Sequence, residues 1–255
     1  MQLNYLSYGS GHPLIILHGL FGSLDNWHTL SKSFAKHYQV FSLDQRNHGR
    51  SPHSDEFNYS ILVEDLLDFI DQQNIAAAHI LGHSMGGKAA MQFALSYPHR
   101  VSKLIIADIA PKSYPPTLLE LFETLTSIDL SRFSNRKEID IALAQEVPDF
   151  GVRQFILKNI YLNEEEKFCW KMNLPVLKKS YLEMSGSINL ANTFSQPTLF
   201  VRGEKSSYIE ESDTELIKTF FPLAEIVTMA KVGHWVHAEN PKEFFQIVAE
   251  FLKKE

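Results

Sequence analysis

The chain has 255 residues, of which 44% are hydrophobic, and its formal net charge is −6. This length supports one domain with a substantial core, or one domain with a small insertion. The mild acidic excess gives no reason to expect binding to nucleic acid or to anionic membranes. A single cysteine, Cys169, excludes an internal disulfide and fits a reducing compartment.

Export and membrane signals are missing from the sequence. The first residues, MQLNYLSYGSGHP, lack the basic start and the apolar run of a signal peptide. No apolar stretch approaches the roughly 20 residues that a membrane span needs. We therefore expect a soluble, cytoplasmic protein without a membrane span, while its oligomeric state is left open.

Short apolar runs alternate along the chain with longer segments of helical periodicity. Five of the runs are apolar on both faces and end in turn or polar residues, as is typical of parallel strands covered on both sides. They are residues 13–19, 38–44, 78–84, 102–110 and 197–203, and residues 224–230 are predicted as a last strand. The alternation predicts an α/β fold with right-handed crossovers.

Helical periodicity is clearest in three segments between or after the strands. Residues 59–73 (YSILVEDLLDFIDQQ) present one dominantly apolar side, and KAAMQFALSYP, from residue 88, stops at Pro98. Residues 240–254 (NPKEFFQIVAEFLKK) predict an amphipathic helix with Phe244 and Val248 on its apolar side.

One long segment, residues 112–192, contains no run that predicts a parallel strand. It opens with proline-rich sequence and continues in helical pieces, so we predict a mostly helical cap inserted into a core of residues 1–111 and 193–255. An apolar cap that covers a ligand site favours acyl groups over sugars or peptides as ligands. Eight apolar residues of the cap could line an acyl pocket or pack the cap onto the sheet, and we expect both roles among them: Tyr114, Leu118, Phe122, Phe155, Ile156, Tyr161, Trp170 and Leu174.

The segment LGHSMGG (residues 81–87) matches the pattern G-x-S-x-G between a predicted strand and a predicted helix. Such a sharp turn needs Gly82 and Gly86, because side chains there would collide with neighbouring backbone. The turn exposes the Ser84 hydroxyl at a helix N-terminus, where the helix dipole favours negative charge. We predict Ser84 as a nucleophile and the Met85 N–H as one donor to an oxyanion. The alternative is a glycine-serine turn without chemistry.

The segment LHGLFGS (residues 17–23) closes an early strand with a second glycine turn. Here the N–H of Leu20 or Phe21 is predicted as the second oxyanion donor. Leu20 is favoured because it directly follows His18 and Gly19, and His18 itself is interpreted as structural. The alternative is a glycine-rich loop with no catalytic part.

His234 is the candidate base, in the segment GHWVHAENP between the last strand and the last helix. The ordinary pKa of an imidazole lets it take the serine proton and return it to the leaving group. His237 is interpreted as a structural contact at the start of the next element. The other nine of the 11 histidines show no metal-ligand spacing, so neither a metal site nor a cofactor is expected.

Together these motifs resemble the α/β-hydrolase superfamily and, in detail, the YbfF-like esterases. The match is carried by HGLFGSLDNW, DQRNHGRS, GHSMGGKA, DIAP and GHWVHAENP, in the family's order. It runs from about residue 3 to the C-terminus and is weakest in the insertion. The resemblance implies a mostly parallel eight-stranded sheet flanked by helices, with a helical cap after strand six. It also implies hydrolysis of carboxylic esters, with acyl thioesters as a further class.

The acid that orients the histidine is not where most members of this superfamily carry it. Their Asp stands three residues after the glycine that ends strand seven; that glycine is Gly203 here, so the position holds Ser206. A serine cannot carry the charge that stabilises an imidazolium. Asp108 closes the neighbouring strand, and the carboxyl ends of parallel strands lie side by side. We predict Asp108 as the acid, with Glu204 as the alternative and a turn-capping role as the interpretation without chemistry.

Two further features are given structural interpretations. Asp44, Arg46, His48 and Gly49 of the segment DQRNHGRS are expected to bind the loop network below the active site. Lys88, just past the nucleophile, is interpreted as a surface residue or a contact of the loop at Arg46, without a role in the chemistry.

The sequence thus predicts a cofactor-free serine hydrolase of small-molecule acyl esters, and of acyl-CoA thioesters as a further class, acting through an acyl-enzyme. Ser84 attacks the carbonyl, His234 moves the proton and Asp108 holds the imidazole. A carbon–carbon bond hydrolase or lyase of a small metabolite would use the same triad. A ligand-binding protein without catalysis is the alternative of another class, and fold alone does not decide among them.

Overall fold

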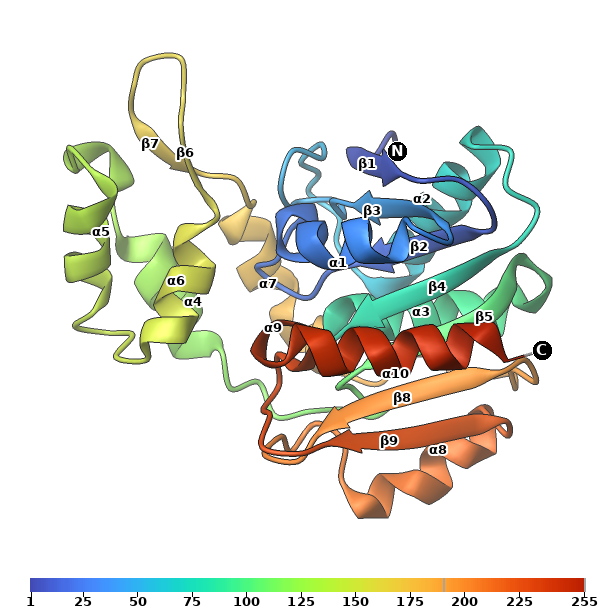
Figure 1. Cartoon of the computed structure of the whole chain (residues 1–255). Coiled ribbons are helices and arrows are strands. Elements are labelled where there is room, and N and C mark those ends of the chain that lie inside the picture. Colours follow the sequence, from blue (N-terminus) through green and yellow to red (C-terminus); the bar gives the residue numbers. More distant parts are fainter. Residues whose placement is uncertain (190, 255) are drawn as a thin grey trace.

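The computed structural model describes residues 1–189 and 191–254; residue 190 of the predicted cap and residue 255 of the predicted core lie outside this range. Its centre is a seven-stranded sheet in the order β1-β3-β2-β4-β5-β8-β9 (Figure 1). The strands are β1 (Tyr5–Tyr8), β2 (Pro13–Leu17), β3 (Gln39–Leu43), β4 (Ala78–His83), β5 (Val101–Ala107), β8 (Thr198–Gly203) and β9 (Ala224–Met229).

Pairing within this sheet is parallel except at one edge, where β1 runs antiparallel to β3. All six strands that the sequence predicts are present, and the mostly parallel α/β-hydrolase architecture is confirmed. The predicted count of eight strands is wrong, since seven lie in the main sheet of the described residues, and the helical segment accordingly follows the fifth strand, β5, and not a sixth. The residues before β1 form no strand and lie against helix α2, where the Met1 amino group donates to Asp68 at 2.8 Å.

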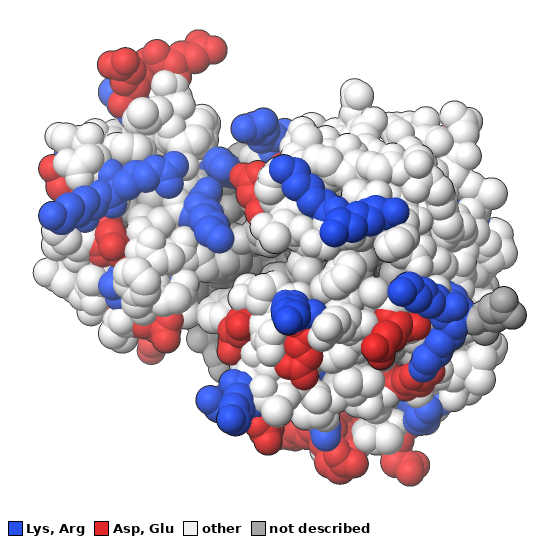
Figure 2. Space-filling view, viewed as in Figure 1, with Lys and Arg blue, Asp and Glu red and all other residues white. Residues whose placement is uncertain are grey.

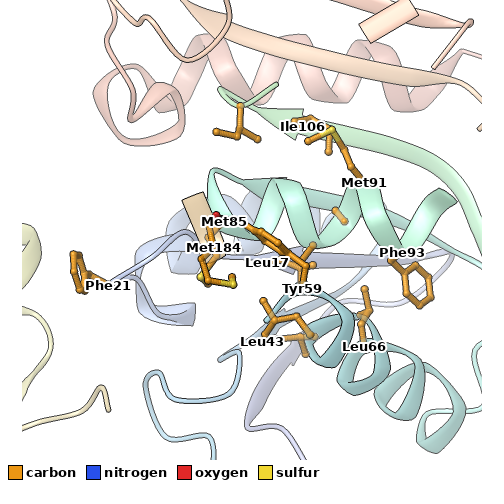
Figure 3. Close-up of a cluster of buried hydrophobic side chains, with 14 of the residues drawn as sticks. Leu17, Phe21, Leu43, Tyr59, Leu66, Met85, Met91, Phe93, Ile106 and Met184 are labelled. Carbon is orange, nitrogen blue, oxygen red and sulfur yellow. Dashed lines mark hydrogen bonds between the residues drawn. The ribbon is translucent and has the colours of Figure 1, made fainter. Parts of the chain in front are cut away.

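Helices cover both faces of the sheet, as the two-sided apolar strands require. Along β2, Leu14 and Ile16 pack in one hydrophobic cluster, whereas Ile15 and Leu17 pack in another. The first cluster contains side chains of α1 (His28–Phe34) and α10 (Pro241–Lys253), and the second contains those of α2 (Tyr59–Gln72), α3 (Met85–Ser96) and α8 (Thr214–Phe220). Figure 3 shows part of the second cluster.

Local signals account for the ends of two of these helices. The side chain of Asn58 caps α2 by accepting the Ile61 N–H at 2.9 Å. Helix α10 begins with Pro241 in its first turn, where the missing proline N–H costs no helical hydrogen bond. The short remaining elements of the core are α9 (Val236–Glu239), η1 (Leu24–Trp27), η2 (Pro98–Arg100) and η4 (Glu211–Asp213).

The segment between β5 and β8 forms a separate layer beside the sheet, and we call residues 112–192 the cap (Figure 1). Its elements are α4 (Leu119–Ser127), η3 (Leu130–Arg132), α5 (Arg136–Leu143), α6 (Phe150–Leu157), β6 (Ile160–Leu162), β7 (Phe168–Trp170) and α7 (Leu174–Ser185). Strands β6 and β7 form an antiparallel hairpin that the sequence analysis did not predict. The division into core and cap at these boundaries stays a prediction.

The cap is fastened to loops at the carboxyl edge of the sheet. The Asn159 side chain donates to the Phe21 carbonyl at 2.7 Å, and the Asn173 N–H donates to the Asn47 carbonyl at 2.9 Å. Figure 2 shows this face of the molecule hollowed between the cap on the left and the core on the right. The candidate site residues lie at this edge, below the cap.

Candidate active site

Ser84 sits at the sharp turn between β4 and α3, with φ 52° and ψ −116°. This strained backbone is held by close packing of its neighbours. A Cβ on Gly82 would lie 2.2 Å from the Gly86 carbonyl oxygen, and one on Gly86 would lie 2.5 Å from the carbonyl oxygen of Leu17. Both glycines are therefore needed for the turn that presents the Ser84 hydroxyl at the start of α3.

Asp108 follows β5 and is fully buried, also at a positive φ of 52°. Its carboxylate accepts the His234 Nδ1–H at 2.8 Å and the Gly203 N–H at 2.9 Å. The Ser206 hydroxyl donates to the same oxygen, Oδ2, that contacts His234. Three donors thus converge on this carboxylate, which stabilises its charge in a site shielded from solvent.

His234 lies in the loop after β9, with its ring held from two sides. Asp108 binds Nδ1, and the Tyr208 ring stacks on the imidazole with centroids 3.9 Å apart and planes 21° from parallel. The Tyr208 N–H in turn donates to the Ser206 hydroxyl at 3.2 Å. With Nδ1 engaged as a donor, the neutral ring leaves Nε2 as its proton acceptor.

Ser84 and His234 line one cavity, but no hydrogen bond joins the Ser84 hydroxyl to the His234 ring in the described part of the chain. In enzymes without substrate, catalytic hydrogen bonds are often long and tighten on binding. The alternative acid, Glu204, is directed elsewhere: its carboxylate accepts the exposed Lys231 N–H at 2.7 Å. Among the weighed carboxylates, Asp108 is the one that reaches His234.

Two other histidines of the motifs pack behind His234. The His83 Nε2–H donates to the His234 carbonyl at 3.0 Å, and His237 stacks on Trp27 at 4.2 Å between ring centroids. Burial lowers the pKa of His237 to about 3 and that of His83 well below its usual value. Both rings are therefore neutral packing elements around the candidate base at neutral pH.

The turn after β2 brings Leu20 and Phe21 beside Ser84. The Phe21 N–H already donates to His48 Nε2 at 3.3 Å. No acceptor within residues 1–189 and 191–254 takes the Leu20 N–H, so that group is available to a ligand. His48 keeps its acceptor nitrogen because its Nδ1–H donates to the Arg46 carbonyl at 2.9 Å and burial lowers its pKa to about 3.

The loop after β3 forms the predicted network below this turn. Asp44 accepts the N–H groups of Leu24 and Arg50 at 2.8 and 2.9 Å. Arg46 makes a two-pronged ion pair with buried Asp65 of α2, with Nη2 to Oδ1 at 2.7 Å. These contacts fix the loop after β3 against the turn after β2 and against α2, and none of them involves a residue that lines the cavity beside Ser84.

Two compartments of the cavity meet at Ser84. The histidine compartment, of about 260 Å³, is lined by His234 and Trp235 together with Phe21, Phe155 and Ile156. The lysine compartment, of about 70 Å³, extends on the other side of Ser84 towards the side chain of Lys88. Its further lining residues are Leu20, Tyr59, Met85, Ile109, Tyr114, Pro115, Leu118, Tyr181, Met184, Ser185 and Tyr208.

The cap supplies part of the roof predicted from the sequence. Tyr114, Leu118, Phe155 and Ile156 line the two compartments. The other four predicted lining residues do not: Phe122 and Leu174 are buried in the hydrophobic cluster, and Tyr161 and Trp170 border a separate hollow beside Arg50.

The interpretation of Lys88 as a surface residue or as a contact of the loop at Arg46 is wrong. Its side chain is buried, and Nζ donates to the Gly186 carbonyl at the end of α7 at 2.6 Å. Helix α3 is enclosed by the sheet, by α2 and by the cap, so even its polar positions are covered.

Across residues 1–189 and 191–254, no group of three or more His, Cys, Asp or Glu side chains is placed to hold a metal ion. In the same part of the chain, no helix combines the length and the apolar character needed to cross a membrane.

Comparisons with known proteins agree with this architecture. Residues 12–141 match the family model of the alpha/beta hydrolase fold. The chain is 34% identical over 241 residues to Esterase YbfF of Escherichia coli, covering 94% of this chain and 92% of that protein. It is also 34% identical to the sn-1-specific diacylglycerol lipase ABHD11 of Danio rerio, covering 96% of this chain and 80% of that protein.

Among solved structures, a marine microorganism esterase superposes with a TM-score of 0.96 at 43% identity, covering 98% of this chain and 99% of that one. E-2-(acetamidomethylene)succinate hydrolase superposes with a TM-score of 0.83 at 18% identity, covering 99% of this chain and 95% of that one, which shows a shared fold alone. The chain therefore belongs to the α/β-hydrolase family, among the YbfF-like esterases.

Proposed function

We propose that this carboxylic ester hydrolase cleaves small-molecule acyl esters through an acyl-enzyme on Ser84. Nε2 of His234 takes the proton from the Ser84 hydroxyl as the oxygen attacks the acyl carbonyl. Asp108, bound to Nδ1 at 2.8 Å, keeps Nε2 as the acceptor and stabilises the imidazolium that forms. The stacked Tyr208 ring holds the imidazole in this plane.

The oxyanion of the tetrahedral intermediate would be held by backbone N–H groups of Leu20 and Met85. Met85 is the first residue of α3, so its N–H belongs to the unpaired start of the helix, where the dipole favours negative charge. Leu20 is assigned over Phe21 because the Phe21 N–H is bound to His48. Preorganised donors of this kind contribute about 3–4 kcal/mol each to lowering a barrier.

Collapse of the intermediate expels the leaving group, which accepts the proton from His234. Water then attacks the acyl-enzyme with His234 as base and releases the carboxylic acid and Ser84. Acyl thioesters, including acyl-CoA, fit the same sequence of steps, because a thiolate leaves with less need for protonation. Esters are the first substrates to test, since the similar Escherichia coli protein and the marine structure are both named esterases.

The observation that carries this proposal is the Asp108–His234 pair facing the cavity that Ser84 lines. Ser84→Ala should lower kcat on 4-nitrophenyl acetate by at least about 10³-fold and abolish labelling by a fluorophosphonate probe. Ser33→Ala serves as the control, because Ser33 is a serine of α1 whose hydroxyl only contacts the Thr29 carbonyl. Unchanged turnover by Ser84→Ala would contradict the proposed mechanism.

The same assays separate the alternatives. A carbon–carbon bond hydrolase or lyase on this triad would be labelled by the probe but turn over simple esters poorly. A ligand-binding protein without catalysis would show neither labelling nor turnover. A series of ethyl esters and acyl-CoA thioesters of increasing chain length then compares ester with thioester hydrolysis on the wild type.

A further inference from the structure

The ammonium group of Lys88 is buried at the end of the lysine compartment. Lys88 follows Ser84 by one helical turn, and its N–H donates to the Ser84 carbonyl at 3.0 Å. Side chains on a helix point towards its N-terminus, so this one leans back in the direction of the nucleophile. The side chain is only 2% exposed, yet it lines the compartment that begins at Ser84.

The groups around this ammonium satisfy it only in part. Nζ donates to the Gly186 carbonyl at 2.6 Å and lies 4.9 Å from the centroid of the Tyr114 ring and 5.7 Å from that of Tyr59. No carboxylate lies within salt-bridge distance of it in the described part of the chain, and none lines the lysine compartment. A buried cation with carbonyl and aromatic contacts alone is costly, and an anion brought to it would be stabilised strongly.

The direction in which a substrate binds follows from where the proton must go. The leaving group takes its proton from His234, so it must lie within hydrogen-bond reach of that ring. His234 lines the histidine compartment and is not among the residues of the lysine compartment. The leaving group therefore belongs in the histidine compartment, and the acyl group extends from Ser84 into the lysine compartment.

We propose that the lysine compartment binds short acyl chains that end in a carboxylate, with Lys88 as the residue that selects them. This inference rests on the proposed acyl-enzyme mechanism. A volume of about 70 Å³ is about half that of a protein cavity that accepts benzene, so the chain between the two ends is short. The substrates are half-esters of small dicarboxylic acids.

The reaction keeps the distal carboxylate unchanged. Water adds to the acyl carbon, the bond between that carbon and the alcohol oxygen breaks, and the products are the dicarboxylate, the alcohol and one proton. Figure 3 shows Tyr59, Met85 and Met184 close to one another, and all three line the apolar part of the compartment. They fit the methylene groups between the two carboxyl carbons.

The test compares substrates of equal shape and different charge. Ethyl hydrogen succinate and ethyl hydrogen glutarate are matched with ethyl 4-methylpentanoate and ethyl 5-methylhexanoate, in which an isopropyl group replaces the carboxylate. Released acid is titrated at constant pH. We expect kcat/KM at pH 7 to favour the half-esters by about tenfold to hundredfold, the usual gain from a hydrogen bond between charged groups.

Lys88→Met removes the charge and keeps the length of the side chain. It should bring the ratio of the two kcat/KM values to one or below while the neutral esters are still hydrolysed. Lys103→Met is the matched control, because Lys103 also donates from Nζ to backbone carbonyls, those of Phe251 and Leu252, away from the cavity. If Lys88 only ties the cap to the core, both substrates lose activity equally and the proposal is overturned.

The wild type offers a second test that needs no variant. Burial lowers the pKa of Lys88 to about 8, so its positive charge is present at pH 7 and lost above pH 8. The titratable groups facing it are the phenols of Tyr59 and Tyr114, with those of Tyr181 and Tyr208 further along the compartment. Burial raises the pKa of Tyr59, Tyr114 and Tyr208, so these three stay neutral. The ratio of half-ester to neutral ester should therefore fall between pH 7 and 9, while any pH dependence of the chemical steps that both esters share cancels in the ratio.

The outcomes separate this inference from the mechanism on which it rests. Equal kcat/KM for half-ester and isostere, unchanged by Lys88→Met, contradicts the inference and leaves the acyl-enzyme in place. Turnover of neither ester, or full turnover by Ser84→Ala, contradicts the acyl-enzyme mechanism and the inference with it.

Discussion

The hydrogen bond between Ser206 and Asp108 suggests that the proposed catalytic carboxylate could be transferred by mutation from position 108, after β5, to position 206, after β8. Ser206 donates to Oδ2 of Asp108, and that oxygen accepts the His234 Nδ1–H at 2.8 Å. A carboxylate at position 206 reaches one bond further than the serine hydroxyl. We predict that Asp108→Asn inactivates the enzyme and that adding Ser206→Asp restores part of the activity.

The magnitudes follow from the contacts of Asp108. An amide there can still accept the Gly203 N–H, but it cannot stabilise the imidazolium, and the comparable loss in a serine protease lowers kcat by about 10⁴, or about 5.4 kcal/mol. In the double variant the amide nitrogen introduced at position 108 can donate to the new carboxylate. We expect Ser206→Asp to raise the kcat of Asp108→Asn by about tenfold to hundredfold. Recovery is incomplete because the new carboxylate is not optimally oriented towards Nδ1 of His234.

The assay is kcat on 4-nitrophenyl acetate for the wild type and four variants, with thermal unfolding to verify that each is folded. Ser206→Asp alone places two carboxylates in one buried site, where like charges oppose each other, so it should be less active than the wild type. Glu204→Gln is the control, because the Glu204 carboxylate binds the Lys231 N–H on the surface and should leave kcat unchanged. Near-full kcat in Asp108→Asn together with its loss in Glu204→Gln would refute the assignment of the acid.

Three further predictions concern stability. Burial lowers the pKa of His18 and His48 to about 4 and about 3, so below pH 6.5 the unfolded chain takes up protons that the folded one does not. The free energy of unfolding, measured with urea, should fall from pH 6.5 towards 4 by up to about 1.4 kcal/mol per pH unit for each histidine, and a flat profile would contradict this. Arg46→Met leaves buried Asp65 without its main partner and should cost about 3–5 kcal/mol by the same measurement, whereas a cost below about 1 kcal/mol would show that the pair contributes little. Gly86→Ala, whose Cβ would meet backbone oxygens at 2.5 Å, should cost about 3 kcal/mol and lower kcat, and wild-type stability would show that the turn can relax.

The sheet was predictable because its strands must be apolar on both faces to lie between two helix layers. Strand β1 escaped prediction, since its residues Tyr5–Tyr8 are mostly exposed at an edge and carry no buried run. The hairpin of β6 and β7 escaped for the same reason, as each strand has three residues and one buried side chain. Short, exposed strands are determined by their partners in space, which periodicity does not report.

The placement of Asp108 beside His234 followed from one rule of parallel sheets, that neighbouring strands end at the same edge. The same rule did not predict the contacts that Ser206 makes. Ser206 and Tyr208 act on the pair through a hydroxyl bond and a ring stack, and both contacts depend on side-chain directions in a turn. Position is the one signal in the sequence for Ser206, because the residue three after Gly203 contacts Asp108 here.

A different signal could have identified Lys88 as buried. Residues 85–95 of α3 are apolar or small around the whole circumference except at Lys88 and Gln92, and a helix that is apolar all round is usually enclosed. A lysine inside such a helix has to find partners within the protein. The identity of those partners depends on where the cap returns to the core, at Gly186, which sequence spacing does not specify.

Buried His48 determines which backbone N–H of the loop at Leu20 and Phe21 is free to bind a ligand. His48 donates from Nδ1 to the Arg46 carbonyl, so Nε2 must accept, and the pKa lowered to about 3 keeps it an acceptor at neutral pH. It therefore holds the Phe21 N–H permanently, while Asn159 of the cap holds the Phe21 carbonyl. Both polar groups of Phe21 are thus engaged, whereas the preceding N–H, that of Leu20, has no acceptor in the described part of the chain, which is why we propose it as the oxyanion donor. The segment DQRNHGRS, which has no group at the reacting atoms, thus determines which backbone donor the loop offers beside Ser84.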